Sequence, residues 1–167
     1  MHHHKSELRQ RVLREQARLL LDAGLNEAAL EVLDQTSEIG SDDSDTIELR
    51  VRVLETLGRG AELRQALSAR LKAARAGGQV ELAVELSLRL GGLHERAGET
   101  ERARGLYRDA LARDPKHRGV LRALLELSAS APLEPAELSS LLDRVIELEA
   151  GEKVANLVVT DCKASLC

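Results

Sequence analysis

Aromatic residues are almost absent from this chain. Its 167 residues include one tyrosine, Tyr107, and neither phenylalanine nor tryptophan. Half-buried β-strands depend on aromatic and β-branched side chains, and proteins that stack nucleobases need aromatic rings. The composition therefore argues against an all-β fold and against a base-stacking site. Leu, Ala, Glu and Arg, which are strong helix formers, are abundant instead, so we predict an all-α protein.

Cysteine is equally scarce, and no long apolar run is present. Cys162 and Cys167 both lie at the C-terminal end, which indicates no disulfide framework. The stretch 1–4 (MHHH) resembles a purification tag or its remnant, in which case the native N-terminus lies elsewhere. Without a run of 18 or more apolar residues, we predict no membrane insertion. We expect a cytoplasmic protein, with a removed signal peptide as the open alternative.

The charges and motifs point away from catalysis. Lys and Arg number 24 against 28 Asp and Glu, and this net charge of −4 gives no general attraction to nucleic acid. His94-Glu95 lacks the second histidine that a zinc-binding helix carries. No phosphate-binding glycine loop and no nucleophile–base pair is recognisable. The sequence predicts no enzyme, no cofactor, no metal and no nucleic-acid partner.

Turn residues recur at a nearly constant interval. Gly24, Gly58, Gly98 and Pro132 are separated by 34, 40 and 34 residues, and this spacing is typical of helical hairpin repeats. We assign the six extra residues to 72–80. Apolar residues such as Leu13, Ala17 and Leu20 recur at helical spacing. Helices are therefore expected at 6–22, from about 26 onward, and at 45–57, 60–76, 79–97, 100–113, 117–129, 135–149 and 152–163.

These helices pair into four expected repeats, at about 6–40, 44–76, 79–115 and 116–150, within one helical domain over 6–150. Residues 1–5 are expected to be a tag or a disordered start. Residues 151–167 are expected to form a final capping or interface helix and a tail.

One stretch carries a recognisable motif. Residues 84–117 contain Ser87-x2-Leu90-Gly91-x2-His94, followed by Ala103-x3-Tyr107, the small Ala110 and the closing Pro115. The pattern resembles the tetratricopeptide repeat, although that family prefers bulky aromatics where Ser87 and His94 stand. The second repeat fits weakly, because Arg50 and Leu63 stand where an apolar and a small residue are expected. The resemblance implies an α-solenoid of about four antiparallel helix hairpins plus a C-terminal helix.

The resemblance also implies that the first helix of each hairpin lines a concave groove. Arg11, Arg14 and Arg18 lie on one face of the first helix by their spacing. The residues that map to the groove are Arg11, Arg14, Arg18, Asp45, Glu48, Arg52, Glu55, Glu85, Leu88, Arg122 and Glu126. We therefore predict a non-catalytic scaffold that binds a peptide or the surface of another protein in this groove.

Three alternatives remain open at this stage. The basic and acidic stripes could neutralise one another instead of binding a partner. The last helix carries Val154, Leu157, Val158 and Cys162 on one apolar face, which would suit self-association as a homodimer through residues 151–167. The chain could also be a regulatory repeat domain of a larger signalling protein.

Overall fold

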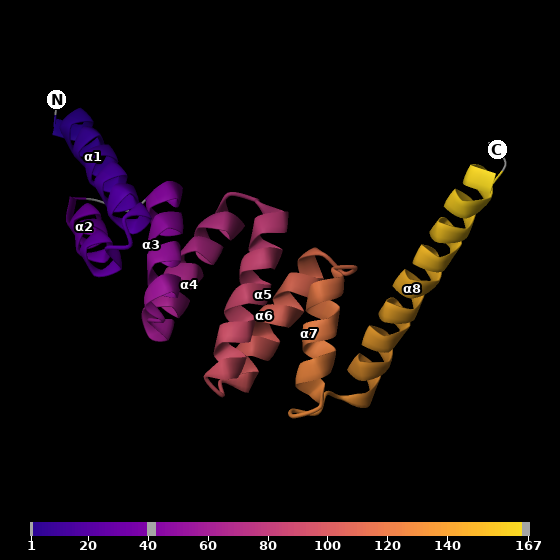
Figure 1. The fold of residues 1–167 in the computed structure, drawn as a ribbon. Helices are drawn as coiled ribbons and strands as arrows, with labels where there is room; N and C mark the ends of the chain where they lie inside the picture. The colour runs from indigo at the N-terminus through magenta and orange to yellow at the C-terminus, as the bar shows by residue number, and fades with distance from the viewer. Residues whose placement is uncertain (1, 40–42, 165–167) are drawn as a thin grey trace. The chain divides into compact units, whose positions relative to one another are not determined.

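The structure is a computed structural model that describes the backbone of residues 2–39 and 43–164 and the side chains of residues 5–39 and 43–151. Its described part consists of helices and turns without a strand, so the all-α prediction is confirmed (Figure 1). The helices are α1 (His2–Asp22), α2 (Asn26–Ile39), α3 (Ser44–Leu57), α4 (Gly60–Ala76), α5 (Val80–Arg96), α6 (Thr100–Arg113), α7 (Arg118–Ser128) and α8 (Pro135–Ala164).

The chain divides into two compact units, Met1–Leu82 and Ala83–Cys167. In the first unit α1 packs on α2 and α3, α2 packs on α3, and α3 packs on α4. In the second unit α6 packs on α7, and α7 packs on α8. This packing of neighbours in sequence is what stacked hairpin repeats require, because a single hairpin cannot bury its apolar face alone.

The predicted glycine turns are present. Gly24, Gly58 and Gly98 have φ values of 76°, 67° and 73°, in the left-handed region that favours glycine after a helix. Gly78 forms a fourth such turn, with φ of 67°.

The six extra residues do not form an inserted loop. Lys72 to Ala76 are helical, and only residues 77–79 separate α4 from α5. Both of these helices have 17 residues, whereas α2 and α3 have 14 each. The insertion therefore lengthens two helices by three residues each. The local sequence explains this, since Lys, Ala and Arg are strong helix formers.

Leucine, valine and alanine fill the core of each unit. In the first unit, Ala17, Leu33, Val51 and Leu67 are fully buried. In the second unit, the core cluster surrounds Tyr107, the largest fully buried side chain, and includes Val84, Ala103, Ala110, Val120, Leu121 and Leu124. Among the described residues, aliphatic side chains therefore make up nearly all of the core, and Tyr107 is its aromatic member.

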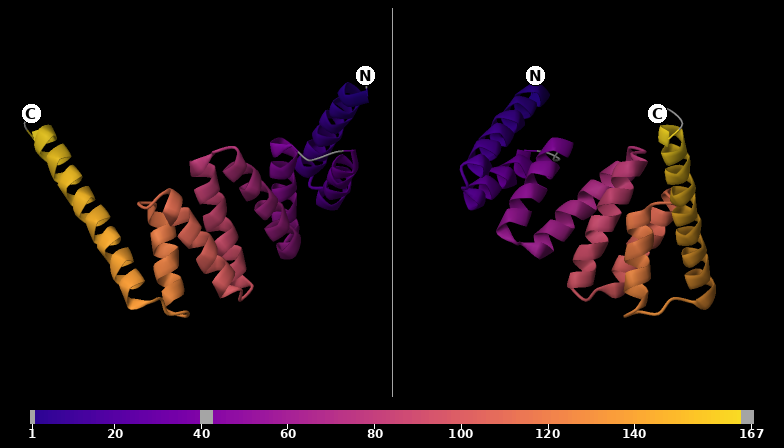
Figure 2. Two further views of the ribbon diagram at one scale, coloured as in Figure 1. Left: turned by 180° about the vertical axis from the view of Figure 1, so that it is seen from behind. Right: turned by 45° about the vertical axis from the view of Figure 1, so that its right-hand side comes forward.

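The ends of the chain differ from expectation. We predicted separate helices at 135–149 and 152–163, but α8 is one continuous helix of 30 residues (Figure 2). A lone glycine such as Gly151 costs only about 1 kcal/mol inside a helix, and good helix formers flank it. The side chains of Val154, Leu157, Val158 and Cys162 lie outside the described residues, as does Cys167. At the other end, α1 already begins at His2, within the expected disordered start.

Candidate partner-binding site

One face of α1 borders a surface hollow of about 840 Å³ in the first unit, which we call the α1 hollow. Four residues predicted to line a groove lie along it: Arg11, Arg14, Arg18 and Asp45. The three arginines come from one helix face, as their spacing requires, and Asp45 comes from the first turn of α3. The α1 hollow therefore combines basic side chains of α1 with an acidic side chain of α3.

The α1 hollow also has apolar side chains that the sequence analysis did not single out. Leu8, Val12 and Leu19 line it and are 46%, 65% and 68% exposed. They face away from Ala17, which is fully buried. The signal was present in the sequence, because positions 8, 12 and 19 follow i, i+4 and i+11 on one helix face. α1 thus has two apolar faces, one packed inward and one facing solvent.

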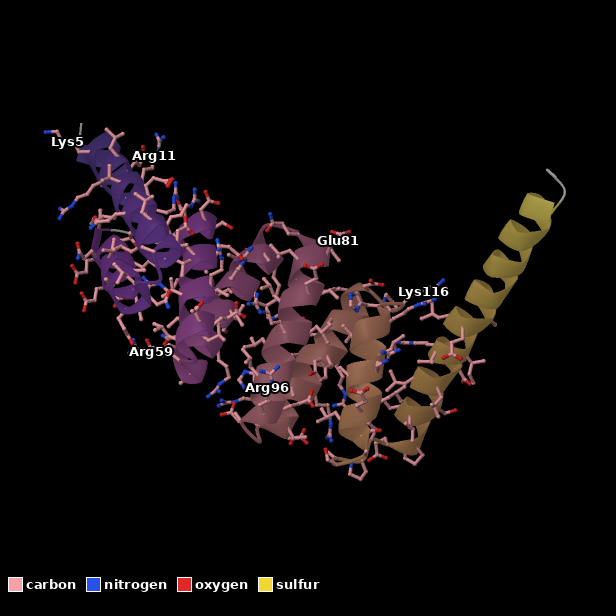
Figure 3. All side chains as sticks on the ribbon, viewed as in Figure 1. Lys5, Arg11, Arg59, Glu81, Arg96 and Lys116 are labelled. Atoms are coloured by element: carbon pink, nitrogen blue, oxygen red, sulfur yellow. The ribbon has the colours of Figure 1, made fainter. Side chains whose placement is uncertain are left out.

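The three arginines have different surroundings. Arg14 forms an ion pair with Asp43, and only 17% of its side chain is exposed. Arg18 pairs with Glu15 of its own helix at 3.2 Å and is half exposed. Arg11 is exposed, extends from α1 in Figure 3, and has no ion pair among the described residues. Arg14 therefore connects α1 to the start of α3, whereas the side chains of Arg11 and Arg18 extend into solvent.

Asp43, the partner of Arg14, also caps the N-terminus of α3. Its carboxylate accepts a hydrogen bond from the backbone N–H of Thr46 at 2.8 Å. Partial burial opposes ionisation of this carboxyl group. The hydrogen bonds from Thr46 and the charge and hydrogen bond of Arg14 outweigh burial and lower the pKa of Asp43. Asp43 is therefore a charged cap that attracts the Arg14 guanidinium to the start of α3.

The predicted acidic stripe of α3 is only partly available. Glu48 forms an ion pair with Arg70 of α4. Asp45 is exposed and lies 3.8 Å from Arg14. Glu55 and Arg52 are also exposed, and the Arg52 guanidinium has no ion pair among the described residues. Mutual neutralisation thus accounts for Glu48 and in part for Asp45, whereas Arg52 remains uncompensated.

The other predicted groove residues belong to the second unit. Arg122 and Glu126 of α7 line a smaller hollow of about 290 Å³ that α8 borders with Val145, Leu148 and Glu149. Glu85 of α5 is exposed, whereas Leu88 is half buried against the core cluster. The predicted groove residues therefore fall into two sets, one in each unit.

The repeat motif has the structural role that its residue types suggest. Leu90, Gly91, Ala103, Tyr107 and Ala110 are all buried. A Cβ on Gly91 would overlap the ring of Tyr107, so the glycine lets α5 and α6 approach closely. Pro115 is exposed and follows Asp114, whose extended backbone (φ −130°, ψ 90°) ends α6.

Polar side chains connect α5 to α6 next to this motif. The hydroxyl of Tyr107 donates a hydrogen bond to Glu95, and burial together with this carboxylate raises the pKa of Tyr107. His94, partly buried, contacts the carboxylate of Glu99 at the N-terminus of α6. The hydrogen bond from His94 lowers the pKa of Glu99. His94 therefore occupies a helix–helix contact, as its place in the motif implies.

Two further observations concern metals and membranes. Among the described residues, no group of three or more His, Cys, Asp or Glu side chains is arranged to hold a metal ion. Within the same residues, no helix has both the length and the apolar character needed to cross a membrane.

Comparison with known proteins agrees with the repeat motif. A family model described as "Tetratricopeptide repeat" matches residues 84–127. No curated protein sequence matches the chain. Among solved structures, a crystal structure of MamA protein aligns over 89% of this chain and 78% of its own, with 15% identity and a TM-score of 0.62. A second crystal structure of MamA aligns over 88% and 81%, with 16% identity and a TM-score of 0.61.

These likenesses show the fold of the chain, and the motif match places the family signature on α5, α6 and α7. Repeats of this kind are protein-interaction modules. Residues 84–127 therefore match the tetratricopeptide repeat family, and the chain shares its helical fold with the two MamA structures.

Proposed function

We propose that this protein is a non-catalytic scaffold that binds a partner protein through the α1 hollow. The observation that carries the proposal is the pairing of exposed apolar side chains (Leu8, Val12, Leu19) with two arginines, Arg11 and Arg18, that have exposed guanidinium groups. Contiguous apolar side chains bordered by polar ones mark interaction surfaces on soluble proteins. Arginine is also enriched in such interfaces.

The chemistry of the α1 hollow indicates what kind of partner fits. Lys5, Arg9, Arg11 and Arg18 are exposed on α1 around the apolar side chains, and they outnumber the exposed acidic residues Glu7, Glu15 and Asp45. A matching segment therefore needs apolar side chains for the centre and carboxylates for the rim. An amphipathic helix with leucines at i, i+4, i+7 and i+11 and glutamates beside them meets both requirements, since helices bind in apolar grooves through this spacing.

Electrostatics should control the strength of this binding. The arginines are at the exposed rim, where ion pairs are screened by salt. Rim charges mainly affect the rate of association and the choice of partner. We expect affinity to fall as salt concentration rises, and acidic partners to be preferred over basic ones.

The test uses two labelled synthetic helical peptides with the same leucine positions, one with glutamates and one with lysines on the rim. Fluorescence anisotropy measures their binding to the full chain. We expect the glutamate peptide to bind and the lysine peptide to bind at least about tenfold more weakly, a difference of about 1.4 kcal/mol. The charge reversal Arg11→Glu/Arg18→Glu should invert this preference.

A matched control variant has the same total change in charge, but at two residues that are far from α1 in the sequence. Lys72 of α4 and Lys116, just after α6, are exposed. The double variant Lys72→Glu/Lys116→Glu should retain the preference of the wild type. Equal affinity of the wild type for both peptides, or no binding of either, would contradict the proposed site. Arg14 is left unchanged in these variants because its contact with Asp43 supports the fold.

A further inference from the structure

A second helix presents exposed apolar side chains with the same spacing as those of α1. On α8, Leu142 and Ile146 are 46% and 62% exposed. They are four residues apart, like Leu8 and Val12 on α1. The inward face of α8 is a different one, formed by Leu141, which is buried, and by Val145 and Leu148, which pack against the core cluster.

The charges beside the two apolar faces have opposite signs. Two exposed acidic residues of α8, Asp143 and Glu147, accompany Leu142 and Ile146, whereas Glu149 lines the hollow beside Arg122. Four exposed basic residues of α1 accompany Leu8 and Val12, namely Lys5, Arg9, Arg11 and Arg18, and within residues 5–18 they outnumber the two exposed acidic residues, Glu7 and Glu15. Asp143 and Glu147 have no ion pair among the described residues. The two faces therefore have the same spacing of apolar side chains and complementary charges beside them.

The exposed large apolar side chains of the described residues gather on these two helices. Leu8, Val12 and Leu19 lie on α1 and Leu142 and Ile146 on α8, whereas Leu25 and Val80 are isolated from one another in sequence. Neighbouring exposed apolar side chains on one helix face are typical of a surface that another element covers.

We propose that α8 of a second copy of this chain docks on the α1 hollow, so that copies associate head to tail. The inference rests on the proposed function of the α1 hollow and names its partner. Leu142 and Ile146 of one copy pack between Leu8, Val12 and Leu19 of the next. Asp143 and Glu147 face the arginine rim. Because two different surfaces of the chain meet, the contact is heterologous, and it continues from copy to copy unless it closes into a ring.

Sedimentation velocity and light scattering of the full chain test this proposal over a range of concentrations and salt. We expect the average mass to rise with concentration and to fall with added salt. Concentration dependence separates contact between copies from contact within one copy. Wild-type protein that stays monomeric at the highest soluble concentration in low salt would overturn the inference.

Charge-reversal variants identify the surfaces. Arg11→Glu/Arg18→Glu makes both faces acidic, and Asp143→Lys/Glu147→Lys makes both faces basic, so each variant alone should associate at least about tenfold more weakly. An equimolar mixture of the two should associate again, because the acidic α1 face of one variant then meets the basic α8 face of the other. Lys72→Glu/Lys116→Glu should behave as the wild type. A mixture that stays monomeric, or variants that associate as the wild type does, would overturn the proposal.

The glutamate peptide separates this inference from the proposed function. If the α1 hollow binds α8 of a second copy, an excess of the peptide should reduce the average mass of the wild type to that of the monomer. Peptide binding by a chain that is monomeric throughout would overturn the inference while leaving the proposed function intact. Failure of both the peptide and the self-association experiment would overturn both. Circular dichroism of each variant confirms that the helices are retained.

Discussion

Gly91 and Tyr107 form a matched pair across the contact between α5 and α6. A Cβ on Gly91 would lie 2.7 Å from Cζ of Tyr107, closer than van der Waals contact allows. The ring is fully buried and its hydroxyl donates a hydrogen bond to Glu95, so it has little freedom to move away. The Tyr107 ring, the only aromatic side chain of the core, therefore fits in this place only because residue 91 is glycine.

Gly91→Ala should therefore destabilise the protein by about 1–3 kcal/mol, as overpacking of a core typically does, although alanine is the better helix former. Gly92→Ala is the matched control, because it lies in the same helix and a Cβ there meets nothing within 4 Å. It should stabilise by up to about 1 kcal/mol. Urea unfolding followed by circular dichroism measures both. Equal effects of the two substitutions would contradict the close contact at Gly91, and Tyr107→Leu should relieve part of the cost of Gly91→Ala.

This contact shows how far the sequence alone could lead. The spacing from Ser87 to Pro115 was enough to place Gly91 and Tyr107 in one motif, because the motif is local and its period is that of a helix hairpin. The bond from Tyr107 to Glu95 could not be foreseen. It depends on the angle between α5 and α6, which brings together side chains of two helices.

Ser87 occupies a fully buried position in the same motif, where the family prefers a large aromatic ring. Its hydroxyl oxygen is one of the buried polar atoms of the described residues without a hydrogen-bond partner. An unsatisfied buried hydroxyl costs about 1–3 kcal/mol. Ser87→Ala should therefore leave the free energy of unfolding unchanged or raise it by up to about 1 kcal/mol.

Thr36 provides the comparison for Ser87. It is equally buried, but its hydroxyl donates a hydrogen bond to the carbonyl of Leu33 at 2.6 Å. Thr36→Val, which keeps the shape and removes the donor, should lower the free energy of unfolding by about 1 kcal/mol. Both variants are measured by urea unfolding. A loss of stability in Ser87→Ala as large as that in Thr36→Val would show that the Ser87 hydroxyl is in fact satisfied.

The candidate site was harder to predict than the fold. Spacing placed Arg11, Arg14 and Arg18 on one face, and they do line one hollow. It could not show that Arg14 contacts Asp43, because that contact joins residues 29 positions apart. It also left out Leu8, Val12 and Leu19, because the inward stripe with Ala17 accounted for the helix by itself. An exposed apolar face is recognisable only once the packed face is known.

The cap at Asp43 should give stability a component that depends on pH. Its pKa is lowered in the folded state from the ordinary value of 3.8. A carboxyl group of this kind stabilises the fold fully above its unfolded pKa, and this contribution is lost as pH falls through the lower folded pKa. Because the side chain is half exposed, the contribution is at most about 1 kcal/mol.

Asp43→Asn keeps a capping oxygen for the N–H of Thr46 and removes the titrating group. Urea unfolding over a series of pH values compares this variant with the wild type. Above pH 3.8 the wild type should be the more stable of the two, and the difference should shrink as pH falls below that value. A difference that is constant with pH would show that the charge of Asp43 does not contribute. Asp43→Ala, which also removes the cap, should cost about 0.5–2 kcal/mol at neutral pH.

Arg50 marks the place where the second repeat departs from the family pattern, and the structure gives it a role. The Arg50 side chain is only 16% exposed, and its guanidinium forms an ion pair with Asp34. The guanidinium also donates hydrogen bonds to the carbonyl of Leu33 at 2.6 Å and to the hydroxyl of Ser37 at 2.9 Å. An apolar residue at this position would only pack against α2. The arginine instead connects α3 to α2 through polar contacts.

Arg50→Met keeps the length and helix propensity of the side chain but removes every donor. It should destabilise the protein by about 1–3 kcal/mol, the range of hydrogen bonds made by a charged group. The stability of Arg50→Lys should lie between that of Arg50→Met and that of the wild type, because lysine keeps the charge but lacks the planar guanidinium with its several donors. Arg52→Met is the matched control on the same helix, where an exposed guanidinium without an ion pair among the described residues should change stability by no more than about 0.5 kcal/mol. Urea unfolding measures the stability of each variant. If Arg50→Met is as stable as Arg52→Met, the contacts of Arg50 with α2 do not stabilise the first unit, and an apolar residue at position 50 would serve equally well.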